Sequence, residues 1–196
     1  MRTVSFQADD LAKALRRRKI ATMPELKLAL GTAVDVTVFR KLKQIAYRTS
    51  YSHRGAYYAL DETARFDANG LWSFHSVWFS RWGTLLDTAE AYVENSVAGC
   101  FVEELDNLLH AGTKEPLLKL VRQERVTRQP AGGLYLYCSI KAALRERQLL
   151  ASQLWVSLKH PAGHQLAPAQ SRLDRTIQIQ TADRLARHPL LLNQLQ

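Results

Sequence analysis

The chain contains only two cysteines, Cys100 and Cys138, among its 196 residues. Two cysteines are too few for a disulfide framework or for a cysteine-based zinc site. The chain also lacks any apolar run approaching the roughly 18–20 residues that a membrane-spanning helix needs. Its first ten residues include acidic Asp9 and Asp10, where a secretion signal would be apolar. We therefore expect a cytoplasmic protein with no membrane partner.

Motifs of common catalytic chemistry are absent as well. The sequence has no glycine-rich phosphate loop, no HExxH motif and no Gly-x-Ser-x-Gly turn. The histidines are scattered. His160 and His164 have helical spacing, but Pro161 and Gly163 lie between them and disfavour a helix, which argues against a metal site. We therefore expect a protein that is not an enzyme and that needs no cofactor and no metal.

Acidic residues are in deficit, and the resulting charge is unevenly distributed. The net charge is +9. Residues 1–62 carry 12 Lys and Arg against 6 Asp and Glu, and residues 140–196 carry 8 against 3. Residues 63–139 carry 7 against 9. A basic surface is typical of proteins that bind polyanions, although a solvated basic surface has the same composition.

Apolar periodicity predicts three helices at the start of the chain. Residues 6–19 have a short apolar stripe at helical spacing that ends in the basic run "RRRK". Residues 25–30 follow Pro24, which suits a first helical turn, and stop at Gly31. Residues 33–46 begin with a Thr-x-x-Asp pattern typical of a capped helix start.

The third predicted helix has two faces. The face expected to be buried contains Val34, Val38, Leu42 and Ile45. The face expected to be exposed contains Thr37, Arg40, Lys41 and Gln44. Residues 47–51 and 56–60 are then rich in Thr, Ser and Tyr and flank the turn "SHRG", which predicts a β-hairpin.

The same order of elements recurs about eighty residues later. "ELKLAL" at residues 25–30 aligns with "ELDNLL" at residues 104–109, an offset of 79. The predicted hairpins align at an offset of 78, in "RGAYYAL" and "GGLYLYC". A register held across two helices and a hairpin indicates a tandem repeat, with residues 83–96 as the first helix of the second copy.

The repeat divides the chain into four parts. Residues 1–62 form a basic first domain, residues 63–82 an aromatic-rich connector, residues 83–139 a second domain and residues 140–196 a basic helical tail. The connector aromatics fit a base-stacking surface or a packing surface between the two domains. We favour packing, because residues 61–82 carry three acidic side chains against two arginines and so have net negative charge. The predicted fold is mainly α with small β-hairpins, in the α+β class.

Each copy resembles a winged helix-turn-helix domain, and "ATMPELKLALGTAVDVTVFRKLKQIAYRTSYSHRGAYYAL" at residues 21–60 is the clearer match. The resemblance covers residues 6–60 and 83–139, and it implies two winged helix-turn-helix domains in tandem plus a C-terminal helical tail. A weaker likeness is to tandem winged-helix proteins of bacterial mobile elements.

The resemblance implies that the third helix enters the DNA major groove and that the hairpin, or wing, reaches the neighbouring backbone or minor groove. The implied DNA contacts of the first domain are Thr37, Arg40, Lys41, Lys43, Gln44, Arg48, His53 and Arg54, with Arg17, Arg18 and Lys19 as further basic candidates. Those of the second domain are Lys114, Lys119 and Arg122. The second copy departs from the pattern at Glu115 and at its uncharged hairpin tip "PAGG", so weaker DNA binding, dimerisation and partner binding all stay open for it.

Two functions are consistent with these patterns. One is a protein that binds double-stranded DNA without catalysis, as a transcriptional regulator or a mobile-element accessory factor. The other is a tandem winged-helix adaptor subunit of a chromosome-organising or other nucleic-acid-associated complex. A homodimer or a protein partner, held by the second domain or by the tail, is compatible with both.

Overall fold

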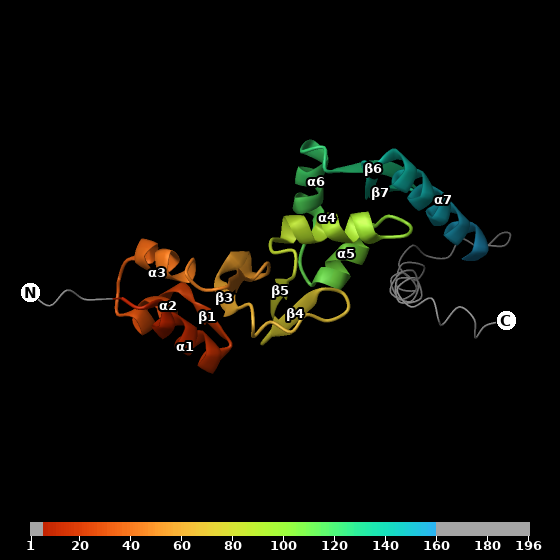
Figure 1. Cartoon of the computed structure of the whole chain (residues 1–196). Coiled ribbons are helices and arrows are strands. Elements are labelled where there is room, and N and C mark those ends of the chain that lie inside the picture. Colours follow the sequence, from red (N-terminus) through yellow and green to blue (C-terminus); the bar gives the residue numbers. More distant parts are fainter. Residues whose placement is uncertain (1–5, 160–196) are drawn as a thin grey trace, which may run out of the picture. The chain divides into compact units, whose positions relative to one another are not determined.

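The computed structural model describes residues 6–159, which contain seven α-helices and small antiparallel sheets of two or three strands (Figure 1). The class is therefore mixed α and β. Contacts divide the chain into two units, residues 1–88 and residues 89–196. In the part that is described, no helix is both long and apolar enough to cross a membrane. The part of the predicted basic helical tail beyond residue 159 lies outside the described residues.

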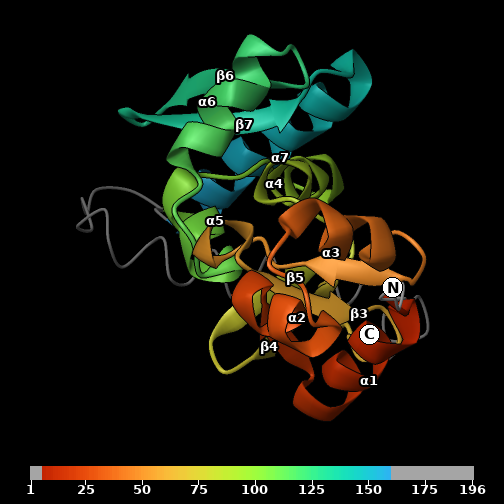
Figure 2. The same cartoon turned by 90° about the vertical axis from the view of Figure 1, so that its left-hand side faces the viewer.

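Unit 1 begins with α1 (Ala8–Arg18), β1 (Ile20–Thr22), α2 (Met23–Leu30) and α3 (Asp35–Leu42). Helix α1 has acidic residues in its first turn and arginines in its last, and both complement the helix dipole. Helix α2 ends at Gly31, whose left-handed φ of 73° costs a glycine little, as the sequence predicts. All three helices gather beside the small sheet of this unit (Figures 1 and 2).

That sheet has three antiparallel strands. After α3 come β2 (Tyr47–Thr49), a single 3-10 turn (His53–Gly55) and β3 (Tyr57–Leu60). Strand β3 is central, because it pairs with β1 on one side and with β2 on the other. The first β-strand, only three residues long, thus joins the hairpin into one sheet.

Alternation along β3 divides its side chains between two apolar clusters. Tyr58 and Leu60 face the helices, while Ala59 packs in a second cluster with Val77 and Phe79. The buried members of the helix-side core are Leu11, Leu15, Ala21, Leu26, Leu30, Val38, Leu42, Tyr58 and Leu60.

The second cluster is covered by a hairpin that lies in the segment predicted to be a connector. Its strands are β4 (Leu71–Phe74) and β5 (Val77–Ser80). Trp72 and Phe79, with ring centroids 5.0 Å apart, pack on the sheet of unit 1 itself. The interpretation of these rings as packing between two domains is therefore wrong for this pair. They complete the first unit, because β3 presents apolar side chains on both faces.

Unit 2 repeats the order of elements. Helix α4 (Leu85–Asn95) runs across the boundary and is followed by α5 (Val102–Leu109), α6 (Lys114–Arg122), β6 (Val126–Ala131) and β7 (Leu134–Ser139). Strands β6 and β7 pair, and α6 packs against β6 (Figures 1 and 2).

Two details show how closely the units correspond. Cys100 pairs with Tyr137 of β7 in an isolated bridge, which puts β7 between this bridge and β6, as β3 lies between β1 and β2. The N–H of Phe101 donates to Glu104 at 2.8 Å, and in unit 1 the N–H of Thr22 donates to Glu25 at 2.8 Å. The predicted repeat therefore extends to the way α2 and α5 begin.

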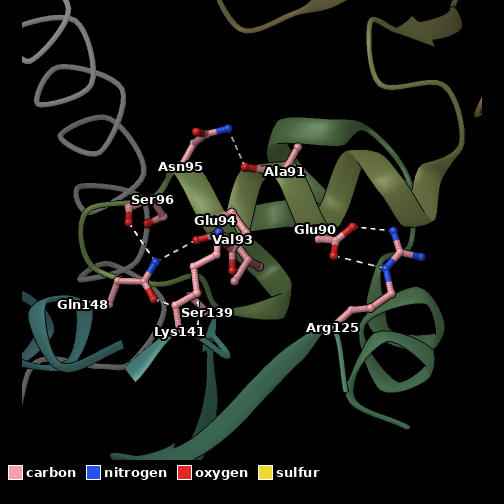
Figure 3. A network of polar contacts seen from close by, with 10 residues as sticks. All are labelled: Glu90, Ala91, Val93, Glu94, Asn95, Ser96, Arg125, Ser139, Lys141 and Gln148. Carbon is pink, nitrogen blue, oxygen red and sulfur yellow. Dashed lines mark hydrogen bonds and ion pairs between the residues drawn. The ribbon is translucent and has the colours of Figure 1, made fainter. Parts of the chain in front are cut away.

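A buried glutamine helps to hold the helix after β7 on unit 2. Gln148 of α7 (Ala142–Lys159) is fully buried. Its Oε1 accepts the N–H of Ser139, and its Nε2 donates to the carbonyl oxygens of Val93 and Ser96 (Figure 3). The first part of the predicted tail thus packs with the second unit through polar contacts.

Candidate functional site

Many basic side chains of unit 1 are held by carboxylates. The pairs are Lys13 with Asp9, Arg16 with Glu62, Arg18 with Glu25, Lys27 with Asp35, and Arg48 with Asp61. A paired, half-exposed cation attracts a polyanion less strongly, because its partner cancels much of its field.

The cations of α3 and of the tip of the following hairpin, unlike the five named above, have no carboxylate partner in the described residues. Arg40, Lys41 and Lys43 lie at the end of α3, and Arg54 lies at the hairpin tip. Within residues 6–159, none of these four makes an ion pair with a carboxylate. Their positive charge is therefore uncompensated by ion pairs in the described part of the chain.

Helix α3 is shorter than predicted, and its exposed face differs. It begins at Asp35, so Val34 precedes the helix as its N-cap and is 55 % exposed. The expectation that Val34 is buried is wrong. Thr32 does not form the predicted box with Asp35, since its hydroxyl accepts the N–H of Val34 at 3.2 Å while Asp35 pairs with Lys27.

The residues predicted on the exposed face of α3 are divided. Arg40 and Gln44 are exposed, as is Lys43, whereas Thr37 and Lys41 are half-buried. The prediction omits two side chains that are exposed, Val36 and Phe39. The signal that could have found them is their spacing with Arg40 and Lys43, which is i, i+3, i+4 and i+7.

The tip of the β2–β3 hairpin has an unusual backbone. His53, Arg54 and Gly55 have φ values of 51°, 54° and 74°, in the left-handed region that disfavours side chains with a Cβ. The tip is held from outside the hairpin. The backbone N–H of Trp78 in β5 donates to the hydroxyl of Ser52 at 2.8 Å. Strand β5 therefore helps to keep Arg54 in a conformation that would be costly in isolation.

Arg54 is exposed, and it lines an open cavity of about 460 Å³ between the hairpin and the start of α4. Arg48, also predicted to contact DNA, lines the same cavity but donates to Asp61 and to the carbonyl of Arg81. The charge of Arg48 is thus committed within unit 1, whereas that of Arg54 is available to solvent.

The other predicted basic contacts of unit 1 lie in varied surroundings. His53 is exposed at the hairpin tip, and its Nδ1 lies 2.9 Å from the hydroxyl of Ser52. Arg17 is exposed on α1, while Lys19 lies over the ring of Phe74, 5.1 Å from its centroid. Arg18 is paired with a carboxylate, as described above.

In unit 2, the predicted contacts are exposed on α6. Lys114, Lys119 and Arg122 are exposed there, and so is the acidic Glu115. Arg125 makes a two-point ion pair with Glu90, which ties β6 and its preceding turn to α4 (Figure 3). This surface therefore mixes both signs of charge, and the glycine-rich turn between β6 and β7 adds no charge.

No group of three or more His, Cys, Asp or Glu among residues 6–159 is arranged to hold a metal ion. No protein-family model, curated protein or solved structure matches this chain.

Proposed function

We propose that this protein binds double-stranded DNA through unit 1, as a winged helix-turn-helix domain. Helix α3 enters the major groove, and the β2–β3 hairpin is the wing that contacts the adjacent backbone or minor groove. The roles that fit such a protein are a transcriptional regulator or a mobile-element accessory factor, and neither requires catalysis.

The topology of unit 1 supports the fold assignment. Its elements follow the order helix, strand, helix, helix, strand, strand, with β3 central in the sheet. A winged helix-turn-helix domain has this order, and the arrangement puts the second and third helices side by side while the hairpin follows the third helix directly. Unit 2 has the same order, with the Cys100 bridge where unit 1 has β1.

The observation that carries the proposal is the division of the cations. Arg17, Lys19, Arg65 and Arg81 make no ion pair with a carboxylate in the described part of unit 1. Ion pairs hold Lys13, Arg16, Arg18, Lys27 and Arg48, whereas Arg40, Lys41, Lys43 and Arg54 have no carboxylate partner in the described residues. These four belong to the two elements that would meet DNA. Phosphate groups could supply the missing partners, and Arg40 has the donors to read guanine as well.

The adaptor function remains a second candidate, because unit 2 exposes apolar side chains. Val97, Leu134, Tyr135, Ile140 and Leu150 are all exposed. Together with the mixed charge on α6, they fit a protein contact better than a phosphate backbone. In a DNA-binding protein, unit 2 would then serve a second copy or a partner.

The experiment is fluorescence anisotropy of a labelled mixed-sequence duplex titrated with the full chain between about 50 and 200 mM salt. We compare the wild type with Arg40→Ala and Arg54→Ala. Each variant should lose about tenfold in affinity. A cation that contacts phosphate should also lower the slope of log K against log salt by about 0.9.

Lys13→Ala is the matched control, since it removes one exposed positive charge from α1 that Asp9 already pairs. It should change affinity far less than either test variant. Equal losses for all three variants would indicate a diffuse charge effect and contradict the assignment to α3 and the wing. Absence of binding at the lowest salt would favour the adaptor.

A further inference from the structure

The outer face of α3 combines apolar and cationic side chains in one stripe. Val36, Phe39, Arg40 and Lys43 are spaced i, i+3, i+4 and i+7, and all are exposed. Val36 therefore neighbours both Phe39 and Arg40 on the helix surface, and Lys43 neighbours the same two residues from the other side. We call these four residues the α3 stripe. Its first half is apolar and its second half is positively charged.

The apolar half is unusual for this unit. The large apolar side chains that unit 1 exposes in its described residues are Leu28, Val34, Val36 and Phe39, at 80 %, 55 %, 73 % and 39 % exposure. They lie on α2, on α3 or in the turn between them. Apolar exposure is thus concentrated around α3, beside the unpaired cations, and has no counterpart elsewhere on the described surface of the unit.

The ring of Phe39 also packs on a buried aromatic side chain of β3. Its ring meets Tyr58 edge-on, with centroids 6.2 Å apart and an angle of 69° between the planes. Tyr58 is buried in the helix-side core. The part of Phe39 that stays exposed is therefore held in place before any partner arrives, which lowers the entropy cost of binding.

The acidic residue at the start of α3 does not oppose an anionic partner strongly. Asp35 pairs with Lys27 of α2, with Nζ and Oδ1 2.8 Å apart. The stripe therefore presents apolar surface next to positive charge, with the nearest carboxylate compensated. Charge complementarity points to a polyanion that also carries apolar groups.

The DNA major groove offers this combination. Phosphates border the groove, and the C5 methyl of thymine is the apolar group that base edges present there. We propose that Val36 and Phe39 contact thymine methyl groups, so that the protein selects sites by the presence of thymine opposite the first half of α3. This inference rests on the proposed DNA-binding function, and it adds the base that the apolar half of the stripe recognises.

The test compares thymine with uracil, which differs only in lacking that methyl group. Duplexes are first selected from a random pool by binding to the full chain, and the best sequence is then synthesised again with uracil in place of thymine. Competition titrations measure the ratio of the two affinities. Removal of one methyl group that the protein buries should weaken binding about fourfold, and removal of two should weaken it more than about tenfold.

Val36→Ala/Phe39→Ala should bring this ratio close to one, because the side chains that contact the methyl groups are then removed. Val36→Ala alone should reduce the logarithm of the affinity ratio by about half. Val36 is 73 % exposed, so this substitution should not affect folding. Val97→Ala is the matched control, because it shortens an exposed valine of unit 2. It should leave the ratio as in the wild type.

The outcomes separate the two proposals. Equal, salt-dependent binding of both duplexes by the wild type would overturn the thymine contact and leave DNA binding intact. A ratio that persists in the double variant would also overturn it, because other residues would then contact the methyl groups. Failure to bind either duplex at low salt would overturn the DNA-binding function, and the thymine contact with it.

Discussion

Replacement of Gln148 should destabilise unit 2 more than its single polar side chain suggests. The Gln148 amide makes three hydrogen bonds to backbone groups, at 2.9 Å to the N–H of Ser139, 2.7 Å to the carbonyl of Val93 and 2.9 Å to that of Ser96 (Figure 3). Val93, Ser96 and Ser139 are all buried. In Gln148→Leu, the N–H of Ser139 and the carbonyl of Ser96 would lose this buried partner, whereas the carbonyl of Val93 would keep the N–H of Ser96 at 3.3 Å.

The magnitude follows from the two groups that lose their partner. Leaving one buried donor or acceptor unsatisfied costs about 1–3 kcal/mol, so we expect Gln148→Leu to lower the free energy of unfolding by about 2–5 kcal/mol. That is a large fraction of the stability of a typical domain. Urea denaturation followed by circular dichroism measures the decrease. Amide hydrogen exchange at Ser139 then locates it, since exchange there should accelerate most.

Gln153→Leu is the matched control, because Gln153 lies on the same helix and is exposed. It should change stability by less than about 0.5 kcal/mol. A decrease below about 1 kcal/mol in Gln148→Leu, with unchanged exchange at Ser139, would refute the argument that this side chain fastens α7 to the unit.

Gln148→Glu adds a pH dependence to the same site. The second carboxyl oxygen would face the carbonyl oxygens of Val93 and Ser96, so burial and repulsion would raise the pKa of this carboxyl in the folded state. The folded state would then bind more protons than the unfolded state above the ordinary glutamate pKa. Stability of the variant should therefore fall as pH rises, whereas Gln148→Leu should show no such additional dependence.

Three further substitutions test two positions in unit 1 and Gly99, which precedes the Cys100 bridge of unit 2. The N–H of Thr22 holds the pKa of Glu25 below its usual range, so stability from this carboxylate should disappear as pH falls through about 4 and below, and urea midpoints of Glu25→Gln should lack that part of the acid dependence. Ser52→Ala removes the acceptor of the Trp78 N–H, so urea denaturation should show a decrease of about 1–3 kcal/mol in the free energy of unfolding. It should also lower DNA affinity, although Ser52 is buried and cannot contact DNA itself. Gly99→Ala should destabilise by more than about 1 kcal/mol in the same assay, because φ is 68° and the new Cβ would lie 2.8 Å from a backbone oxygen of β7.

The sequence predicts the elements whose signals are local. Pro24 and Gly31 bracket α2, and the structure has this helix at Met23–Leu30 with Gly31 as its left-handed cap. The offset between the copies correctly places α5 and α6 as well, because both the apolar spacing and the glutamate near the helix start are repeated. These features depend on neighbours within one or two turns, so they are visible in a single sequence.

The β4–β5 hairpin could not be predicted in the same way. Its turn is His75–Ser76, with φ values of 47° and 62°, where hairpins of this kind usually have Asn and Gly. Strand β1 is only three residues long, and its pairing with β3 is a contact across almost forty residues. Both features depend on long-range packing, because β3 has apolar side chains on both faces that must be covered. The local turn sequence contains no signal for this requirement.

Gln148 shows that helical periodicity can assign a residue to the wrong face of a helix. In an amphipathic helix the leucines of the basic tail would be buried and its polar residues exposed, yet Gln148 is fully buried and Leu150 is 60 % exposed. A polar residue in a helical pattern is normally assigned to the exposed face. The assignment fails here because three backbone groups from α4, its following turn and β7 converge on one amide, which is information that only the folded chain contains.

The exposed face of α3 shows how the choice of criterion decides the functional interpretation. Polarity selects Thr37 and Lys41, which are half-buried. Geometry selects differently, because residues turn by about 100° each around a helix and Val36 lies about 200° from the buried Val38. The side of α3 opposite the core must therefore include Val36, whatever its polarity. A recognition surface defined by position relative to the core, and then examined for chemistry, leads to an apolar and cationic stripe and to a base preference that a search for polar residues alone would miss.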